Sequence, residues 1–158
     1  CLHYPFEIEW FLSNNGPCLF QPFAAEFAII ANKLGYRKIN LFRTLAPEYP
    51  PEKLAEKIKK SSELRDGIIV YGHDYPAIHN ALAYCKDKGV PVVSLVSDLP
   101  GAQRLCHVGI NQYQAGRTAG LLMSKSKRVT GDLIMVSGRF DYSAHIQRIV
   151  GLRDVFIK

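Results

Sequence analysis

Polar side chains follow most of the segments that we expect to form strands, at the place where each strand ends. They are amides, carboxylates, hydroxyls, an imidazole and a guanidinium, which supply hydrogen-bond donors and acceptors in fixed directions. Such a set suits a neutral ligand rich in hydroxyl groups, and the rings of Phe20, Phe140 or Tyr142 suit its apolar face. The polar candidates are Asn14, Asn15, His73, Asp74, Ser97, Asp98, Asn111, Gln112 and the group from Arg139 to Tyr142.

Helix capping is an alternative role for some of these residues. Asp74 and Asn111 each precede a segment expected to be helical, where a side-chain oxygen can accept from a free backbone N–H group. Capping alone explains their residue types, and one residue can serve both roles.

The sequence lacks the motifs that catalysis or nucleotide binding would need. It contains no G-x-S-x-G elbow, no Walker phosphate loop, and no G-x-G-x-x-G after its first expected strand. His73 and His79 are six residues apart, which differs from the H-E-x-x-H spacing that places two imidazoles on one helix face. We therefore expect a binding protein without a metal or cofactor, not an enzyme.

Apolar runs and amphipathic segments alternate along the chain and would position these side chains. The run 67–71 is continuously apolar, as in a parallel strand covered on both faces. Strands are expected at 6–12, 38–42, 67–71, 90–96, 107–110 and 133–136, and helices at 19–34, from 51, at 74–88, at 112–124 and from 143. This order predicts an α/β fold with a doubly wound parallel sheet, which binds ligands beyond the carboxyl ends of its strands. In the helix 112–124, Gly116 and Gly120 are expected to allow close packing on that sheet.

Composition and charge exclude other classes of protein. The chain has 158 residues, 47% of them hydrophobic, and no apolar run approaches the roughly 20 residues of a membrane-spanning helix. The net charge of +6 is spread along the sequence, and the densest group, Lys57, Lys59 and Lys60, fits a solvated helix face better than a DNA-binding patch. The four cysteines form no C-x-x-C pair, which predicts structural thiols in a reducing cytoplasm. The N-terminus shows no export signal; a lipidated Cys1 is an alternative to a start inside a longer protein.

Four sequence blocks, in their order and spacing, resemble the effector-binding domain of lactose-repressor-type (LacI/GalR family) transcription regulators. They are Asp66-Gly-Ile-Ile-Val70, Gly89-Val-Pro-Val-Val93, Val108-Gly-Ile-Asn-Gln-Tyr-Gln-Ala-Gly-Arg-Thr-Ala-Gly120 and Arg148-Ile-Val-Gly-Leu152. The resemblance extends from Phe6 to Lys158. It implies a periplasmic-binding-protein-like type I fold, in which two Rossmann-like lobes close on a small ligand.

The resemblance also implies an organisation and a site. Residues 1–128 correspond to the first lobe, and residues 129–158 to the first strand and helix of the second. Arg148 matches an arginine that donates to sugar hydroxyls in relatives. Asn111 stands where the family usually has aspartate, and Val96 stands where many relatives have a sugar-binding aspartate. The nearest carboxylate, Asp98, either takes that role through a different loop path or indicates a different ligand.

The implied function is sensing of a small-molecule effector, such as a sugar, by a cytoplasmic regulator or repressor. Operator DNA would be bound by a helix-turn-helix domain outside this chain, and the protein would be a homodimer without a membrane partner. A periplasmic sugar-binding protein of an ABC transporter is the alternative, because it shares the fold and the cleft. A small Rossmann-like enzyme is a third possibility, but it would need a nucleophile or cofactor loop that the sequence does not show.

Overall fold

A five-stranded sheet forms the larger part of the molecule. The computed structural model describes residues 5–13, 17–126 and 131–157, without the side chains of residues 17–25. The strands are β1 (Phe6–Ser13), β2 (Ile39–Ala46), β3 (Gly67–Tyr71), β4 (Val92–Leu95) and β5 (Cys106–Val108). They pair in the order β2-β1-β3-β4-β5, and all four pairings are parallel. The predicted α/β class with a parallel sheet is confirmed.

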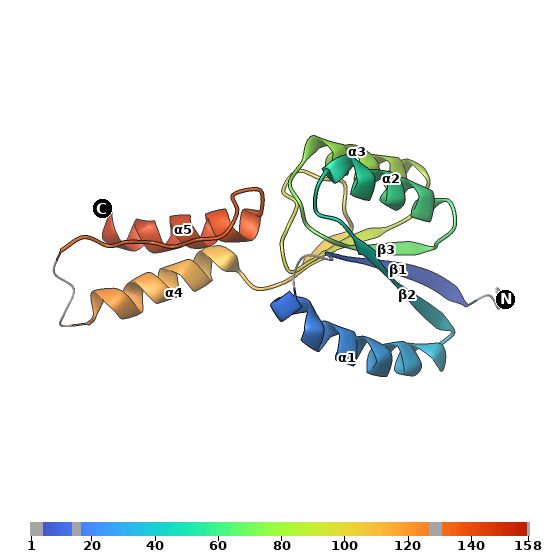
Figure 1. Cartoon of the computed structure of the whole chain (residues 1–158), viewed down its shortest axis with the longest axis horizontal. Helices are drawn as coiled ribbons and strands as arrows, with labels where there is room; N and C mark the ends of the chain where they lie inside the picture. Colours follow the sequence, from blue (N-terminus) through green and yellow to red (C-terminus); the bar gives the residue numbers. More distant parts are fainter. Residues whose placement is uncertain (1–4, 14–16, 127–130, 158) are drawn as a thin grey trace.

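Three helices connect the strands and lie on both faces of the sheet. Helix α1 (Pro17–Gly35) lies on one face, and α2 (Pro51–Ser62) and α3 (Pro76–Asp87) lie side by side on the other (Figure 1). Both α2 and α3 begin with proline, whose fixed φ and missing N–H group suit the first position of a helix. The arrangement is the doubly wound one that the alternating sequence pattern predicts.

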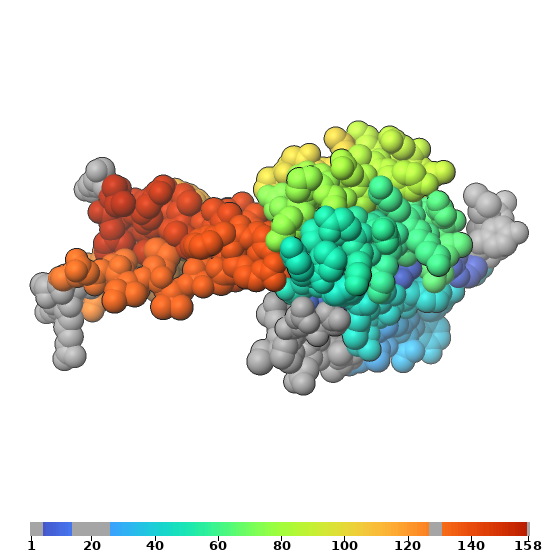
Figure 2. Space-filling model, turned by 45° about the horizontal axis from the view of Figure 1, so that its top comes forward, coloured from blue at the N-terminus to red at the C-terminus, as the bar shows by residue number. Residues whose placement is uncertain are grey.

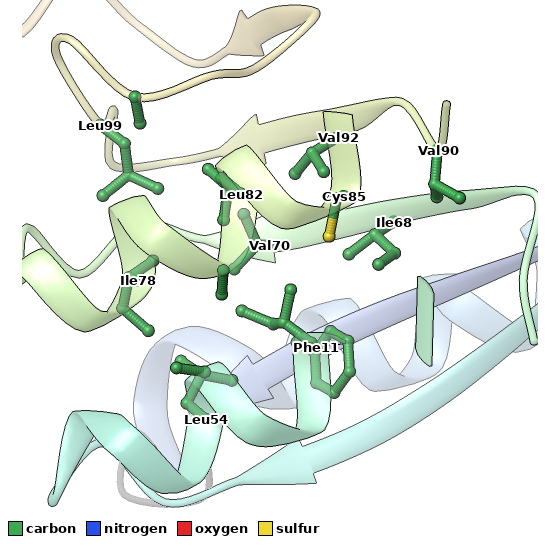
Figure 3. Packing of buried hydrophobic residues seen from close by; sticks show 14 of the residues in the cluster. Phe11, Leu54, Ile68, Val70, Ile78, Leu82, Cys85, Val90, Val92 and Leu99 are labelled. Atoms are coloured by element: carbon green, nitrogen blue, oxygen red, sulfur yellow. The ribbon is translucent and has the colours of Figure 1, made fainter. Parts of the chain in front are cut away.

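The main hydrophobic core lies between the sheet and the pair α2 and α3. Phe11, Ile68 and Val70 point from the sheet toward Ile58 and Leu82 of the two helices, and each of these side chains is at most 2% exposed. Figure 3 shows this layer, with Cys85 and Leu99 completing it toward β4. Because the core holds β1, β3 and β4 in register, it fixes where their carboxyl ends lie.

Helices α4 (Gln112–Ser124) and α5 (Ser143–Phe156) form a second body beside the sheet (Figures 1 and 2). They pack on each other at very short range: a Cβ atom added to Gly116 would lie 2.1 Å from the Arg148 carbonyl oxygen, and one added to Gly151 would lie 2.1 Å from that of Tyr113. The expectation that Gly116 and Gly120 allow packing on the sheet is therefore wrong, because these glycines face another helix. The division expected at residue 128 stays a prediction, and the packing of α4 favours an earlier division.

The largest differences between the expected and the observed elements concern β2 and the run 133–136. Strand β2 continues to Ala46, four residues beyond its expected end, because its whole length pairs with β1. The strand expected at 133–136 does not form among the described residues, and its Ile134 and Val136 are 86% and 93% exposed. A β-strand requires a hydrogen-bonding strand beside it, and the described strands all belong to the five-stranded sheet; the segment instead lies along α4 and α5. No helix in the described part of the chain is long and apolar enough to cross a membrane.

Candidate functional site

The segment 139–143 joins the second body to the carboxyl ends of the strands. The backbone N–H of Asp74, after β3, donates to the Asp141 carbonyl oxygen at 3.1 Å. The Ser143 hydroxyl, at the start of α5, donates to the Asp98 carbonyl oxygen at 2.6 Å. The two bodies thus meet at the sheet edge where parallel α/β folds bind ligands, and the junction is visible in Figure 2.

His73 and Tyr142 form the buried centre of this junction. His73 is 2% and Tyr142 is 5% exposed, and the Tyr142 hydroxyl lies 2.6 Å from His73 Nε2. Burial raises the pKa of Tyr142, and the nearby Tyr71 and the Glu48 carboxylate, which follows β2, add to this effect. Burial lowers the pKa of His73, and this effect exceeds the opposite influence of Glu48 and Asp141. The imidazole is therefore neutral at pH 7.

Ionic groups surround this centre. The Arg139 guanidinium binds Asp141 with two nitrogens and donates to Glu48 Oε2 at 3.2 Å. The Tyr75 hydroxyl donates to Asp141 at 2.9 Å. Although burial opposes it, hydrogen bonding by Arg139 and Tyr75 holds the pKa of Asp141 below its ordinary value. The segment is thus held to the ends of β2 and β3 by oriented, charge-assisted hydrogen bonds.

Asp98, proposed from the sequence as a ligand-binding residue, is held by groups of the first body, which is the sheet with α1, α2 and α3. Arg104 donates to both of its carboxylate oxygens, at 2.6 and 2.7 Å, and the Ser94 hydroxyl and Leu99 N–H group donate to Oδ1. These hydrogen bonds outweigh burial and lower the pKa of Asp98. The geometry gives Asp98 a bracing role at the end of β4; a ligand contact for it stays a prediction.

The chain makes a strained turn between β4 and Asp98. The Ser97 N–H group donates to the Leu95 carbonyl oxygen at 2.8 Å, which closes a three-residue turn around Val96. Val96 has φ +69°, a left-handed conformation that is unfavourable for a β-branched residue. Opposite this turn, Gly72 leaves room for the Ser97 carbonyl oxygen, which would lie 2.3 Å from an added Cβ. The strain is typical of binding and catalytic sites.

Arg148 and Asn111 lie where the second body begins. Arg148 Nε donates to Gln112 Oε1 at 2.5 Å, and Gln112 Nε2 donates to the Val96 carbonyl oxygen at 3.3 Å. Asn111 caps α4, because its side-chain oxygen accepts from the Gln114 N–H group at 2.9 Å. Arg148 is therefore linked through Gln112 to the turn at the end of β4. Capping of α4 by Asn111 is confirmed, and its ligand role stays a prediction.

The structure brings some of the candidate residues together. His73 and Arg139 share Glu48, Asp141 and Tyr142 as neighbours, whereas Phe140 is 70% exposed beside them. Asn14, Asn15 and the side chain of Phe20 lie outside the described residues. The roles of all these side chains in ligand binding stay predictions.

Sequence reasoning missed Glu48 and Tyr71. Glu48 lies two residues after β2, and Tyr71 is the last residue of β3, with its ring 5.3 Å from that of Tyr142. The strand-end rule, which selects polar residues that directly follow a strand, would have found Glu48 after β2. The strand was expected to end at Phe42, so Glu48 was not considered. The described residues contain no group of three or more histidine, cysteine, aspartate or glutamate side chains that could hold a metal ion.

The parallel sheet, with polar side chains gathered at the carboxyl ends of its strands, is the architecture of a class of ligand-binding α/β proteins. The chain belongs to the family of periplasmic binding protein domains, whose model matches residues 54–158. Members of this family are binding proteins and not enzymes, as the sequence predicts. The search of curated proteins gave no match.

Solved structures have the same fold at low sequence identity. A glucose-galactose binding protein, GanP, from Geobacillus stearothermophilus is 20% identical with a TM-score of 0.79; the match covers 95% of this chain and 53% of GanP. An ABC transporter solute-binding protein from Burkholderia graminis C4D1M, in complex with D-arabinose, is 17% identical with a TM-score of 0.82; the match covers 96% of this chain and 52% of that protein. The Caulobacter myo-inositol binding protein, with bound myo-inositol, is 18% identical with a TM-score of 0.78; the match covers 98% of this chain and 51% of that protein.

The chain spans about half the length of these proteins. The periplasmic-binding-protein part of the resemblance to LacI/GalR regulators is thus confirmed. The regulator part gains no support, because these matches are binding proteins of transporters or of sugars and inositol.

Proposed function

We propose that the chain is part of a domain that binds a small neutral polyol, such as a sugar or a cyclitol, between two lobes. The observation that supports this most is the junction of the two bodies, where hydroxyl, imidazole, carboxylate and guanidinium groups gather at the carboxyl ends of β2, β3 and β4. Such groups hydrogen-bond hydroxyls in both directions. The ligands bound by the structurally similar proteins, D-arabinose and myo-inositol, are of this class.

We place the division between the lobes after β5 instead of at residue 128. The sheet with α1, α2 and α3 then forms the first lobe, and α4, the segment 131–142 and α5 begin the second. The close contact between α4 and α5 supports this division, because two helices that touch through Gly116 and Gly151 move as one unit. Segment 139–143 then spans the two lobes and lies where closure would be sensed.

Ligand binding in this proposal shifts the equilibrium between open and closed arrangements of the lobes. The shift can be no larger than the difference in ligand affinity between the two arrangements, which in allosteric systems is about 1–3 kcal/mol. Arg148 is the residue best placed to link ligand binding to this movement of the lobes, because it belongs to the second body and is hydrogen-bonded through Gln112 to the end of β4.

The whole protein that contains this domain is best explained as a solute-binding protein of a sugar transporter. The similar solved structures include such proteins. A second candidate is the effector domain of a cytoplasmic LacI-type regulator, favoured by the block from Val108 to Gly120. In that case operator DNA and a second subunit would be the partners. An export signal encoded upstream of Cys1 would support the solute-binding protein, and a helix-turn-helix domain encoded there would support the regulator.

Titration calorimetry on the full-length protein tests the proposal. The panel is D-glucose, D-galactose, D-arabinose, D-allose and myo-inositol, and we expect saturable binding of at least one. Arg148→Ala should weaken that binding about tenfold or more, as expected when a charge-assisted hydrogen bond is lost. Arg153→Ala is the matched control, because Arg153 lies on the same helix, its side chain is 55% exposed, and among the described residues its ion pair is with the adjacent Asp154. Absence of binding across the panel would refute the proposed ligand class.

A further inference from the structure

One arginine joins two carboxylates that come from different parts of the molecule. Glu48 follows β2 in the first body, and Asp141 lies in the segment before α5. Each nitrogen of the Arg139 guanidinium donates to one of them. Nη1 donates to Glu48 Oε2 at 3.2 Å, Nε donates to Asp141 Oδ1 at 3.0 Å, and Nη2 donates to Asp141 Oδ2. The guanidinium therefore serves the protein's own carboxylates with all three nitrogens.

The surroundings of the two carboxylates make them depend on this cation. Their side chains are only 13% and 14% exposed, so water solvates them poorly. Both contact the same guanidinium and therefore lie close together, where two like charges repel each other. Without Arg139, the approach of Asp141 to Glu48 would be unfavourable. Since the Arg139 side chain is itself 48% exposed, dissolved salt reaches the group and screens the attraction.

Uncharged hydrogen bonds hold the two carboxylates in place. The Ser13 hydroxyl donates to Glu48 Oε1 at 2.5 Å, and the Tyr75 hydroxyl donates to Asp141 Oδ2 at 2.9 Å. The backbone N–H group of Asp74 donates to the Asp141 carbonyl oxygen at 3.1 Å. The carboxylates are thus oriented where one guanidinium bridges them.

We propose that Glu48, Arg139 and Asp141 form an ionic latch that holds the second body against the first. The latch brings the start of α5 to the carboxyl ends of β3 and β4. Arg139 is then a positioning residue, and this role replaces the ligand contact that the sequence suggested for it.

The latch has a consequence for ligand binding, which rests on the proposed function. A site between the two bodies is complete only while they are joined, so the latched arrangement is the one that binds the polyol. Weakening the latch lowers the population of that arrangement, and the apparent Kd rises in proportion. A neutral polyol has no charge to be screened, so a fall of its affinity with salt that depends on Arg139 is the specific sign of the latch.

The Asp74 amide reports the latch directly, because it belongs to the first body and donates to Asp141. Its hydrogen exchange is measured by NMR in the 158-residue chain. Arg139→Gln should make exchange at Asp74 about fivefold or more faster, as expected when charge-assisted hydrogen bonds are lost. Raising NaCl from about 0.05 to 1 M should accelerate exchange in the wild type but not in Arg139→Gln. Arg153→Gln is the matched control, because the ion pair of Arg153 is with Asp154 near the other end of α5.

A double variant separates the charge of Arg139 from its packing. In Arg139→Gln, Glu48 and Asp141 repel each other with no cation between them. Adding Glu48→Gln removes this repulsion and should restore part of the protection of the Asp74 amide, whereas a role of Arg139 in packing alone predicts no recovery. Equal exchange at Asp74 in Arg139→Gln and the wild type, or no recovery in the double variant, would overturn the ionic latch.

Calorimetry on the full-length protein tests the consequence for binding, with the panel sugar that binds best. We expect Arg139→Gln to bind it about fivefold or more weakly, and the wild-type affinity to fall with NaCl while that of Arg139→Gln does not. Unchanged or tighter binding by Arg139→Gln would overturn the claim that the latched arrangement binds the ligand. If no sugar of the panel binds, the proposed function fails, and exchange at Asp74 still decides whether the latch exists. Circular dichroism of each variant shows whether an effect reflects loss of folding.

Discussion

Replacing Gly116 by alanine tests the close pairing of α4 and α5. The new Cβ atom would lie 2.1 Å from the Arg148 carbonyl oxygen and 2.9 Å from two further backbone atoms of Arg148. An ordinary contact begins near 3.4 Å, so the two helices would have to separate locally by about 1.3 Å. No change of side-chain rotamer can relieve the clash, because the atoms it meets are backbone atoms.

Two opposing effects determine the magnitude. Alanine favours a helix over glycine by about 1 kcal/mol. Overpacking of a close contact typically costs about 1–3 kcal/mol, and a backbone clash lies at the upper end of this range. We therefore expect Gly116→Ala to destabilise the helix pair by about 1–2 kcal/mol in total.

Hydrogen exchange followed by mass spectrometry measures this change in the two helices separately from the sheet. Peptides of α4 and α5 should exchange faster in Gly116→Ala, while peptides of β3 and α3 should not change. Gly35→Ala is the matched control, because no atom lies within 4 Å of its added Cβ. Slower exchange of α4 in Gly116→Ala, as expected from helix propensity alone, would refute the pairing.

Three further predictions concern the sheet and the site. Because the pKa of His73 is lowered in the folded chain, the unfolded chain takes up a proton at a higher pH than the folded chain does. The free energy of unfolding, measured by urea titration, should therefore fall as the pH drops below about 6.5, and it should fall less in His73→Gln. A rise in the free energy of unfolding over this range would contradict the prediction. Ile58→Ala, at a fully buried position, should cost about 2–5 kcal/mol, whereas Leu64→Ala, at a position 66% exposed, should change stability by less than about 0.5 kcal/mol in the same assay. Val96→Gly should raise the melting temperature through relief of about 1 kcal/mol of strain at φ +69°, and a lower melting temperature would show that the turn is unstrained.

The sequence predicts the sheet well because its signals are local. Continuous apolar runs such as 67–71 identify parallel strands, and their order with the helices leads to the doubly wound arrangement. Local signals mislead where a partner decides the structure. The run 133–136 is apolar but has no strand beside it among the described residues, and the glycines of α4 pack on a helix instead of the sheet.

The candidate site was predictable only in part for the same reason. The choice of polar residues after strands finds His73 after β3 and Asp98 soon after β4. It also selects the segment 139–142, although the strand expected before that segment does not form among the described residues. It does not show that His73 is covered by Tyr142, 69 residues away, or that Arg104 engages the carboxylate of Asp98. The Tyr142 contact depends on how the second body meets the sheet, and the Arg104 contact depends on the path of the loop after β4; no local pattern encodes either of them.

Mapping of the bound ligand by NMR shows whether it lies at the carboxyl ends of the strands. Backbone amide signals of the full-length protein are compared with and without the panel sugar that binds best. We expect the largest shifts at the carboxyl ends of β2, β3 and β4, in segment 139–143 and around Arg148. Shifts confined to the amino ends of the strands or to the outer faces of α2 and α3 would contradict it.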